Sequence, residues 1–270
     1  NGDDLLEIAA WNMLDWAPMD TPNEGIVTHQ NCLSVLALRQ VADLAERLGH
    51  KGRKQRWEAL ADRMTAAINA HLWSEKHQAY LDCIHSDGCP SDVVSQQTHT
   101  IAYLSGVARD DRAERCLSAV INPPEGFVAA GSPFFMFFAL EAMARAGLHE
   151  DLLRTMRTYW RPQIEAGATT FWEAYWPEKE RRTRSHCHAW SSAPTYFLPR
   201  EILGIKPLQP GYARVRINPH PCDLRWAHGR VPTPRGPVEC RWERTDGEFH
   251  LDLRLPPDTP ARIELPFTGT

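Results

Sequence analysis

The sequence predicts a mainly α-helical chain with a β tail. Apolar residues recur at helical spacing through residues 1–204, whereas they alternate with polar residues through 205–270. Apolar, aromatic helices also alternate with more charged ones, as an (α/α) toroid with buried inner helices and half-exposed outer helices requires. We therefore expect a partial helical barrel over residues 1–204 and a small antiparallel β domain over 205–270.

About seven helices are expected in the first part. The ranges Thr28–Leu48 and Arg53–Leu72 carry apolar stripes and are separated by Gly49, a typical C-terminal stop, so they should form an antiparallel hairpin. Ser132-Pro133 is a typical helix start, because serine caps a first turn and proline fits into it. The remaining helices are expected at Ser95–Leu104, Asp111–Val120, Phe134–Ala146, Leu148–Tyr159 and Ala189–Leu203.

The tail is predicted to be β structure because its apolar residues repeat every second position. Asp246-Gly247 lies between two such runs and is a strong signal for a β-hairpin turn. Frequent prolines in this part also argue against helix. Strands are expected around Ala213–Ile217, Val238–Trp242, Phe249–Leu255 and Ile263–Leu265.

Composition excludes several classes of function. A net charge of -4 gives no reason to expect nucleic-acid or membrane partners, and no apolar run approaches the roughly 20 residues that span a bilayer. The 7 cysteines form no CxxC pair, so the sequence indicates neither a zinc site nor a disulfide framework, and the compartment stays open. The count of 10 tryptophans is compatible with sugar stacking, but also with a large core.

One local pattern combines a carboxylate with aromatic rings. Residues 167–176 read Gly-Ala-Thr-Thr-Phe-Trp-Glu-Ala-Tyr-Trp, which surrounds Glu173 with Trp172, Tyr175 and Trp176. Aromatic rings can stack on a pyranose face, and a positioned carboxylate can act as a general base. Alternatively, the segment is an aromatic loop that closes one end of the barrel. The residues alone leave both interpretations open.

A second pattern, Ser185–Pro194, contains two histidines beside a cysteine. His186 and His188 flank Cys187, but no third ligand is near in sequence. We therefore expect no metal here. We expect instead that His188 and Trp190 lie at the mouth of the barrel.

Near the N-terminus, Asp15 lies between aromatic residues just before a helix. Its carboxylate could bond sugar hydroxyls while Trp16 stacks on the ring, or Asp15 could simply anchor the loop. Two further loop-to-helix entries, Gln96-Gln97-Thr98 and Gly131–Phe135, are each more typical of a structural role.

The order of these segments is distinctive. Asp15-Trp16 precedes the helix hairpin, and the later segments are Gln96-Gln97-Thr98, Gly131-Ser-Pro-Phe134, Ala168-Thr-Thr-Phe-Trp-Glu173, Ser185-His-Cys-His188, Leu203-Gly-Ile-Lys-Pro207 and Val215-Arg-Ile-Asn-Pro-His220. This order resembles the bacterial α-L-rhamnosidases, glycoside hydrolase family 78, over nearly the whole chain.

The resemblance implies part of an (α/α)6 barrel that binds a terminal L-rhamnose, followed by a small C-terminal β-sandwich. It implies that Glu173 is the general base of an inverting hydrolysis and that His188 contacts the sugar. Cys187 replaces an asparagine of the family motif, which leaves the details of that contact open. The implied substrate-binding residues are Asp15, Trp16, Trp172, His188 and Trp190.

The resemblance also implies what this chain lacks. The family's general acid belongs to a segment that precedes the Asp-Trp pair, and nothing before Trp11 matches it. We therefore expect the acid and the first barrel helices upstream of Asn1, in the same polypeptide. We expect a rhamnosylated glycan or glycoside as substrate, and no cofactor.

Two other functions are compatible with parts of the pattern. Another (α/α)6 glycosidase, acting on glucosides, would share the helices and aromatic loops but not the Ser-x-Cys-His segment followed by this β tail. A non-catalytic sugar-binding or scaffold protein could be built on a degenerate barrel. Activity towards a panel of aryl glycosides distinguishes these alternatives.

Overall fold

The computed structural model describes residues 1–175 and 184–266. Trp176, the last residue of the aromatic segment, lies outside the described residues. The chain divides into two compact units, Asn1–Met143 and Ala144–Thr270, and each is described by itself. The boundary predicted after residue 204 remains a prediction.

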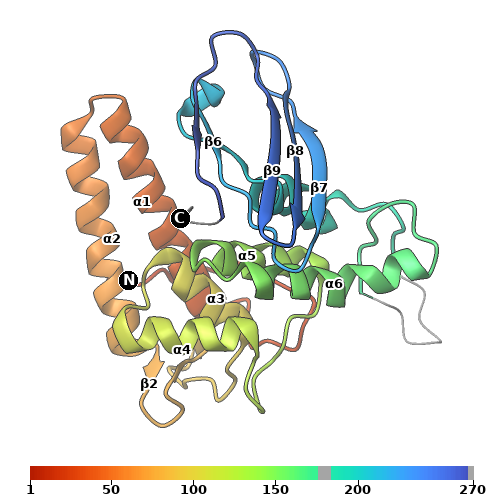
Figure 1. The fold of residues 1–270 in the computed structure, drawn as a ribbon. Coiled ribbons are helices and arrows are strands. Elements are labelled where there is room, and N and C mark those ends of the chain that lie inside the picture. Colours follow the sequence, from red (N-terminus) through yellow and green to blue (C-terminus); the bar gives the residue numbers. More distant parts are fainter. Residues whose placement is uncertain (176–183, 267–270) are drawn as a thin grey trace. The chain divides into compact units, whose positions relative to one another are not determined.

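The first unit contains the predicted helical hairpin. Helix α1 (Thr28–Arg47) and helix α2 (Lys51–His71) pack side by side in opposite directions (Figure 1). The turn between them contains Gly49 with a φ of 76°, a conformation that costs glycine little. The predicted hairpin is therefore confirmed, including the stop at Gly49. The predicted apolar stripe of α1 is wrong in part, because Val41, Leu44 and Leu48 are exposed and the buried face carries Cys32, Val35, Ala42 and Ala45 instead.

Helix α3 (Gln96–Ser105) is the inner helix of this unit. Every residue of α3 except Tyr103 is buried, and the Ser95 hydroxyl caps the helix by accepting a hydrogen bond from the Thr98 amide. Helix α4 (Asp110–Ile121) packs against it with only one face buried. Helix α5 (Pro133–Arg145) begins at the predicted Ser-Pro start. The expected alternation of buried and half-exposed helices is therefore present.

The sequence did not predict four short strands in this unit. One of them precedes α1, and the other three lie between α2 and α3. They are β1 (Gly25–Val27), β2 (Trp73–Ser74), β3 (Ala79–Tyr80) and β4 (Cys83–His85). Strand β1 pairs with β4 and β2 pairs with β3, both antiparallel. Strands of two or three residues are too short to show a period of two, so periodicity could not reveal them.

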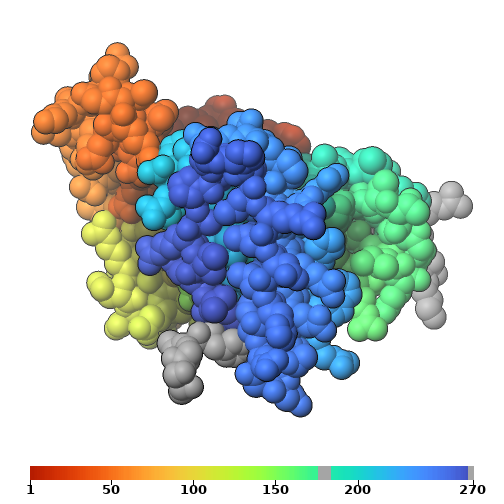
Figure 2. Space-filling model, turned by 45° about the horizontal axis from the view of Figure 1, so that its top comes forward, coloured from red at the N-terminus to blue at the C-terminus, as the bar shows by residue number. Residues whose placement is uncertain are grey.

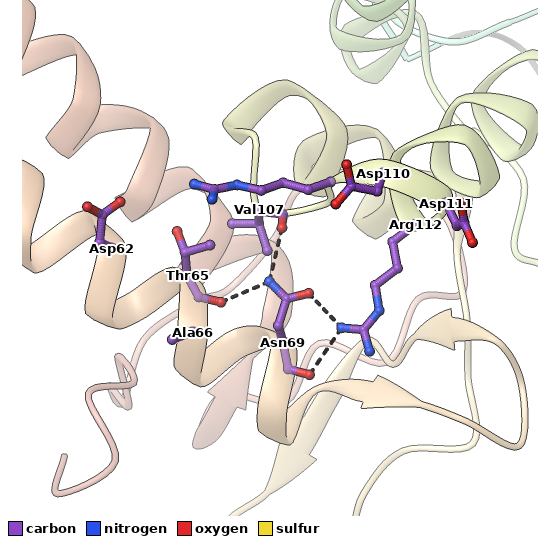
Figure 3. Close-up of a pocket in the computed structure, with 9 residues that line it drawn as sticks. Asp62, Thr65, Ala66, Asn69, Val107, Asp110, Asp111 and Arg112 are labelled. Carbon is purple, nitrogen blue, oxygen red and sulfur yellow. Dashed lines mark hydrogen bonds between the residues drawn. The ribbon is translucent and has the colours of Figure 1, made fainter.

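A polar junction joins the end of α2 to the start of α4 (Figure 3). The side-chain amide of Asn69 donates hydrogen bonds to the carbonyl oxygens of Thr65 (2.9 Å) and Val107 (3.0 Å). Its Oδ1 accepts one from Arg112 Nη1 at 2.7 Å. A cavity of about 720 Å³ lies beside these residues. Because the polar groups at the junction bond to one another, we interpret the junction as structural.

In the second unit, helix α6 (His149–Glu165) runs further than the predicted end at Tyr159 and includes Pro162. The predicted single helix from Ala189 to Leu203 is instead divided. It consists of the 3-10 turn η1 (Ala189–Ser191), helix α7 (Ala193–Phe197) and the π turn η2 (Leu198–Ile202). Pro199 has no amide hydrogen to donate within η2, which explains why regular α-helical bonding stops before it.

The tail forms two three-stranded sheets, with strand orders β10-β6-β5 and β7-β8-β9. The strands are β5 (Ile205–Pro207), β6 (Val215–Ile217), β7 (Trp226–Val231), β8 (Val238–Thr245), β9 (Glu248–Arg254) and β10 (Ala261–Ile263). Asp246-Gly247 forms the predicted hairpin turn between β8 and β9, with Thr245 paired to Glu248. The β10–β6 pair is parallel and the other pairs are antiparallel. These C-terminal strands, coloured blue, form a continuous surface in the space-filling view (Figure 2).

The β7-β8-β9 sheet is anchored to η2 and the residue after it. Trp242 is fully buried and its indole N–H donates to the carbonyl oxygen of Ile202 at 3.1 Å. The thiol of Cys240, on the same face of β8, contacts the carbonyl oxygen of Leu203 at 3.7 Å. The sheet therefore packs directly on the residues that end the helical part.

All seven cysteines are free, and four of them are buried, as expected from their spacing. No helix among the described residues combines the length and apolar character needed to cross a bilayer.

Candidate active site

Two extended segments of the second unit hold Glu173 and His188. The Glu173 amide donates to the Ser185 carbonyl oxygen at 2.9 Å, and the His188 amide donates to the Phe171 carbonyl oxygen at 2.8 Å. A further bond runs from the Thr170 hydroxyl to the His186 carbonyl oxygen. The backbones of the two predicted motifs are thus tied together, although each was read separately in the sequence.

The side chains of these segments meet as well. Oε2 of Glu173 lies 3.8 Å from Nδ1 of His188, within ion-pair range but longer than a hydrogen bond. The Glu173 side chain is 12% exposed and the His188 side chain 30% exposed. The carboxylate is therefore mostly shielded from solvent while one edge stays accessible, an arrangement that suits a general base.

The aromatic residues of the two segments form ring contacts with their neighbours. The ring centroids of Trp172 and His186 are 5.0 Å apart, and those of His188 and Trp190 are 4.4 Å apart. Tyr175 packs against Tyr159 of α6 at 4.7 Å. Trp172 and Trp190 are both partly exposed, so part of each ring remains available to a ligand.

Helix α6 supplies two supporting residues that the sequence reasoning missed. The buried Gln163 accepts a hydrogen bond from the Trp172 amide through Oε1 at 3.3 Å. The buried indole of Trp160 donates to the Ser191 carbonyl oxygen at 2.9 Å. Both lie on the buried face of an amphipathic helix, at a spacing of three. Gln163 is a polar residue on an otherwise apolar helix face, and this feature of the sequence could have revealed its supporting role.

Asp15, in the first unit, is the centre of a buried hydrogen-bond network. Its Oδ2 accepts bonds at 2.7 Å from the Gln97 side-chain amide and from the Gly131 backbone amide. Its Oδ1 accepts a bond from the Trp16 amide at 2.8 Å and one from the Ser132 hydroxyl. Burial raises the pKa of this carboxyl, although the hydrogen bonds act in the opposite direction.

This network connects the Asp15 loop to the two other segments that lead into helices, Gln96-Gln97-Thr98 and Gly131–Phe135. With 6% exposure and four protein donors, the Asp15 carboxylate anchors its own loop to the starts of α3 and α5. A Cβ on Gly131 would overlap the Trp16 carbonyl oxygen, so this close approach requires glycine. A direct bond from Asp15 to a sugar is not tested by this geometry and stays a prediction.

Beside the network, Trp16 is exposed. Its ring is 41% exposed and packs 6.4 Å from that of Trp11. A surface cavity of about 430 Å³ lies next to both rings and to Asp15. Asp15 and Trp16 belong to the first unit, whereas Trp172, Glu173, His188 and Trp190 belong to the second.

His186 and His188 flank a cysteine, so a metal ion could in principle bind near them. Among the described residues, two groups of histidine, cysteine and carboxylate side chains are close enough to share an ion, and neither contains these histidines. The exposed Cys187 between them is also outside both groups.

Comparison with known families identifies the chain. The model of the bacterial alpha-L-rhamnosidase six-hairpin glycosidase domain matches residues 1–202, and that of the bacterial alpha-L-rhamnosidase C-terminal domain matches residues 204–270. The chain belongs to the bacterial α-L-rhamnosidase family. The resemblance and the fold class predicted from the motifs are thereby confirmed.

Individual rhamnosidases show the same relationship. The α-L-rhamnosidase of Formosa agariphila is 26% identical over 276 residues, which cover 93% of this chain and 28% of that protein. The crystal structure of the family 78 rhamnosidase of Bacillus sp. GL1 has 44% identity and a TM-score of 0.93, over 98% of this chain and 29% of that one. The Streptomyces avermitilis α-L-rhamnosidase, complexed with L-rhamnose, shares the fold with a TM-score of 0.72 and 20% identity, over 97% and 25% of the two chains. This rhamnosidase-family chain thus spans less than a third of each relative.

Proposed function

We propose that the protein carrying this chain hydrolyses terminal α-L-rhamnosides with inversion, and that Glu173 is the general base. Membership of the rhamnosidase family supports the substrate class. The single observation that carries the role of Glu173 is its carboxylate, which is mostly shielded from solvent and lies 3.8 Å from His188. The proposed substrate is a rhamnosylated glycan or glycoside.

Inverting hydrolysis needs two carboxyl groups on opposite faces of the sugar. One protonates the leaving oxygen, and the other removes a proton from the water that attacks the anomeric carbon. The two carboxyls stand about 6.5–9.5 Å apart, which leaves room for that water. Glu173 takes the second role, and the acid is proposed to come from a part of the polypeptide outside this chain. Proton transfer between these groups and water requires no cofactor.

The local structure supports a fixed position for the base. Backbone hydrogen bonds at Glu173 and His188 tie both residues to the opposite segment, and Gln163 and Trp160 hold the two segments from α6. A base that is held in place avoids the entropy cost of orienting it in each turnover. The tied segments therefore serve positioning as well as stability.

The remaining predicted residues are proposed to bind the sugar. His188 offers a ring nitrogen to a sugar hydroxyl, while Trp172 and Trp190 shield the reacting carbon from bulk water. The exposed ring of Trp16 is available for stacking. Asp15 keeps Trp16 in place through its own hydrogen bond to the Trp16 amide, so its contribution is positioning even without a sugar contact.

Two measurements on the full-length protein test this function. We expect turnover of an aryl α-L-rhamnoside and not of the matching aryl glucosides. Proton NMR during the first turnovers should show β-L-rhamnose before mutarotation. Preference for a glucoside would favour another glycosidase of this fold, and binding without any turnover would favour a sugar-binding protein. If α-L-rhamnose formed first, the inverting role of Glu173 would be wrong.

A further inference from the structure

Three side chains with metal-binding atoms lie together in the first unit, away from the residues discussed so far. Nε2 of His85 is 2.9 Å from Oδ2 of Asp20 and 3.7 Å from Sγ of Cys83. All three atoms lie within 4.8 Å of one another. Cys83 is buried, whereas Asp20 and His85 are partly exposed, so the group opens to solvent on one side.

The fold brings these residues together through a rigid element. Cys83 and His85 are two positions apart on β4, which places both side chains on the same face of the strand. Strand β4 is fixed by its pairing with β1, in which Val27 lies opposite Cys83. Asp20 reaches the same face from the preceding loop. The cluster is therefore set by sheet register rather than by mobile side chains.

A second layer of contacts holds the loop that carries Asp20. The Asp20 amide donates to Oδ2 of Asp82 at 3.2 Å. The other oxygen of this buried carboxylate accepts bonds from the hydroxyls of Ser95 (2.5 Å) and Thr98 (2.6 Å). Metal ligands in proteins are commonly oriented by hydrogen bonds of this kind. Asp82 also adds a second negative charge near the cluster.

One distance of the cluster matches a tetrahedral zinc site, and a second is shorter. Zinc bonds of about 2.3 Å to sulfur and about 2.0–2.2 Å to nitrogen or oxygen place sulfur and nitrogen about 3.6 Å apart, and nitrogen and oxygen about 3.4 Å apart. The Cys83–His85 distance of 3.7 Å already agrees with the first value. The Asp20–His85 distance of 2.9 Å is about 0.5 Å shorter than the second value, so the proposal requires these two atoms to separate by about that much when the ion binds.

We propose that Asp20, Cys83 and His85 bind a zinc ion through Oδ2, Sγ and Nε2, with water as the fourth ligand. Thiolate and imidazole ligands select zinc over the hard cations calcium and magnesium, which prefer oxygen. Binding releases the thiol proton of Cys83 to solvent, because the thiolate is the ligand. The proton between His85 Nε2 and Asp20 Oδ2 moves to His85 Nδ1 or to solvent, because both atoms become ligands. This site is independent of the proposed hydrolysis.

A second cluster of similar composition differs in that a lysine already binds its carboxylate. His149, Glu201 and His220 also lie within 4.8 Å of one another. However, Lys206 Nζ is 2.5 Å from Oε2 of Glu201, whereas no lysine or arginine pairs with Asp20 among the described residues. A cation already occupies the position that a metal ion would take. That cluster is therefore an ion-pair network.

Cobalt and zinc binding by the full-length protein test the proposal. After dialysis against a chelator, addition of CoCl₂ should produce the thiolate-to-cobalt charge-transfer band and the intense visible bands of tetrahedral cobalt, and ZnCl₂ should abolish both. Cys83→Ser should remove the charge-transfer band, and His85→Gln and Asp20→Asn should weaken cobalt affinity at least tenfold. ZnCl₂ should also raise the Tm of the wild type but not that of these variants.

Cys89→Ser is the matched control. Cys89 lies in the loop that follows β4, and its exposed thiol does not belong to the cluster. This variant should bind cobalt like the wild type. If Cys83→Ser does not fold, His85→Gln still tests the proposal. His85 is partly exposed, so its replacement is expected to leave the fold intact. The proposal is wrong if the wild type shows no charge-transfer band, or if that band is lost in Cys89→Ser and kept in Cys83→Ser.

Discussion

Nδ1 of His188 lies 3.8 Å from Oε2 of Glu173. The two residues come from separate sequence motifs, yet their backbones are joined by reciprocal bonds to Ser185 and Phe171. The relationship explains why the two motifs occur together. It gives the mostly shielded carboxylate a polar neighbour.

His188→Gln is expected to lower kcat/KM for an aryl rhamnoside about 10- to 100-fold, because a hydrogen bond from a ring nitrogen to the sugar is lost. Most of the loss should appear in KM if His188 binds ground state and transition state equally. Cys187→Ser, at the exposed neighbouring position, should stay within about twofold of the wild type, as surface substitutions do. If the two substitutions changed kcat/KM equally, the proposed contact between His188 and the sugar would be wrong.

Asp15→Asn is expected to destabilise the protein by about 2–3 kcal/mol. The carboxylate accepts four hydrogen bonds, and an amide would turn an N–H group towards a donor and leave a buried group unpaired. Urea unfolding measures the change, with Asp3→Asn at an exposed position as control. An unchanged unfolding midpoint in Asp15→Asn would show that the network contributes nothing to stability.

Acidification is expected to destabilise the first unit through its buried histidines. His99 Nδ1 donates to the Ser95 carbonyl oxygen, and its Nε2 accepts from the Tyr80 amide, so only the neutral ring fits. Burial lowers the pKa of His99, and likewise that of His29, from 6.5 to about 4. The unfolded chain then binds protons that the folded chain does not, so stability present above pH 6.5 is lost as the pH falls towards 4.

Each histidine contributes on the order of 3 kcal/mol to this loss. Asp82 and Asp15 act in the opposite sense, because burial raises the pKa of both carboxyls, that of Asp82 to about 6. His220 acts in the same sense as His99 and His29, because burial lowers its pKa to about 4. The free energy of unfolding, measured by urea at several pH values, should therefore fall below pH 6.5. The difference between wild type and His99→Gln should shrink over the same range. Parallel pH curves for the two proteins would contradict this assignment.

Gly204→Ala is expected to cost about 3 kcal/mol or more, because Gly204 has a φ of 86° and a Cβ there would overlap the backbone of Asn218 and Pro219. Gly49→Ala shares the positive φ of 76° but has open space around the added Cβ. It should cost only about 1–2 kcal/mol. Thermal unfolding of both variants measures the difference. Equal losses would show that the close approach at Gly204 relaxes easily.

The sequence predicts secondary structure best where a segment has a clear hydrophobic periodicity or a specific start or turn signal. The α1–α2 hairpin, the Ser-Pro start of α5 and the Asp246-Gly247 turn all appear where they were predicted, although the buried face of α1 differs from its predicted stripe. Periodicity failed for the segment after Ala189, because apolar spacing continues through prolines that interrupt helical hydrogen bonding. It also missed the two- and three-residue strands.

The candidate site shows a different limit. Glu173 and His188 were found from their local surroundings, but nothing local indicates that Gln97 and Gly131 converge on Asp15. Such long-range hydrogen bonds depend on the packing of several helices, and a sequence without that packing shows only separate polar residues. For the same reason each loop looked structural alone, and the network became visible only in three dimensions.

The most direct test of the central claim compares Glu173→Gln with Glu165→Gln in the full-length protein, using an aryl α-L-rhamnoside. Glu165 is an exposed glutamate at the end of α6, paired with Arg161, and serves as the matched control. Loss of the general base should lower kcat about 10²- to 10⁴-fold in Glu173→Gln, with rhamnose binding retained and with Glu165→Gln close to wild type. Wild-type kcat in Glu173→Gln would contradict the account.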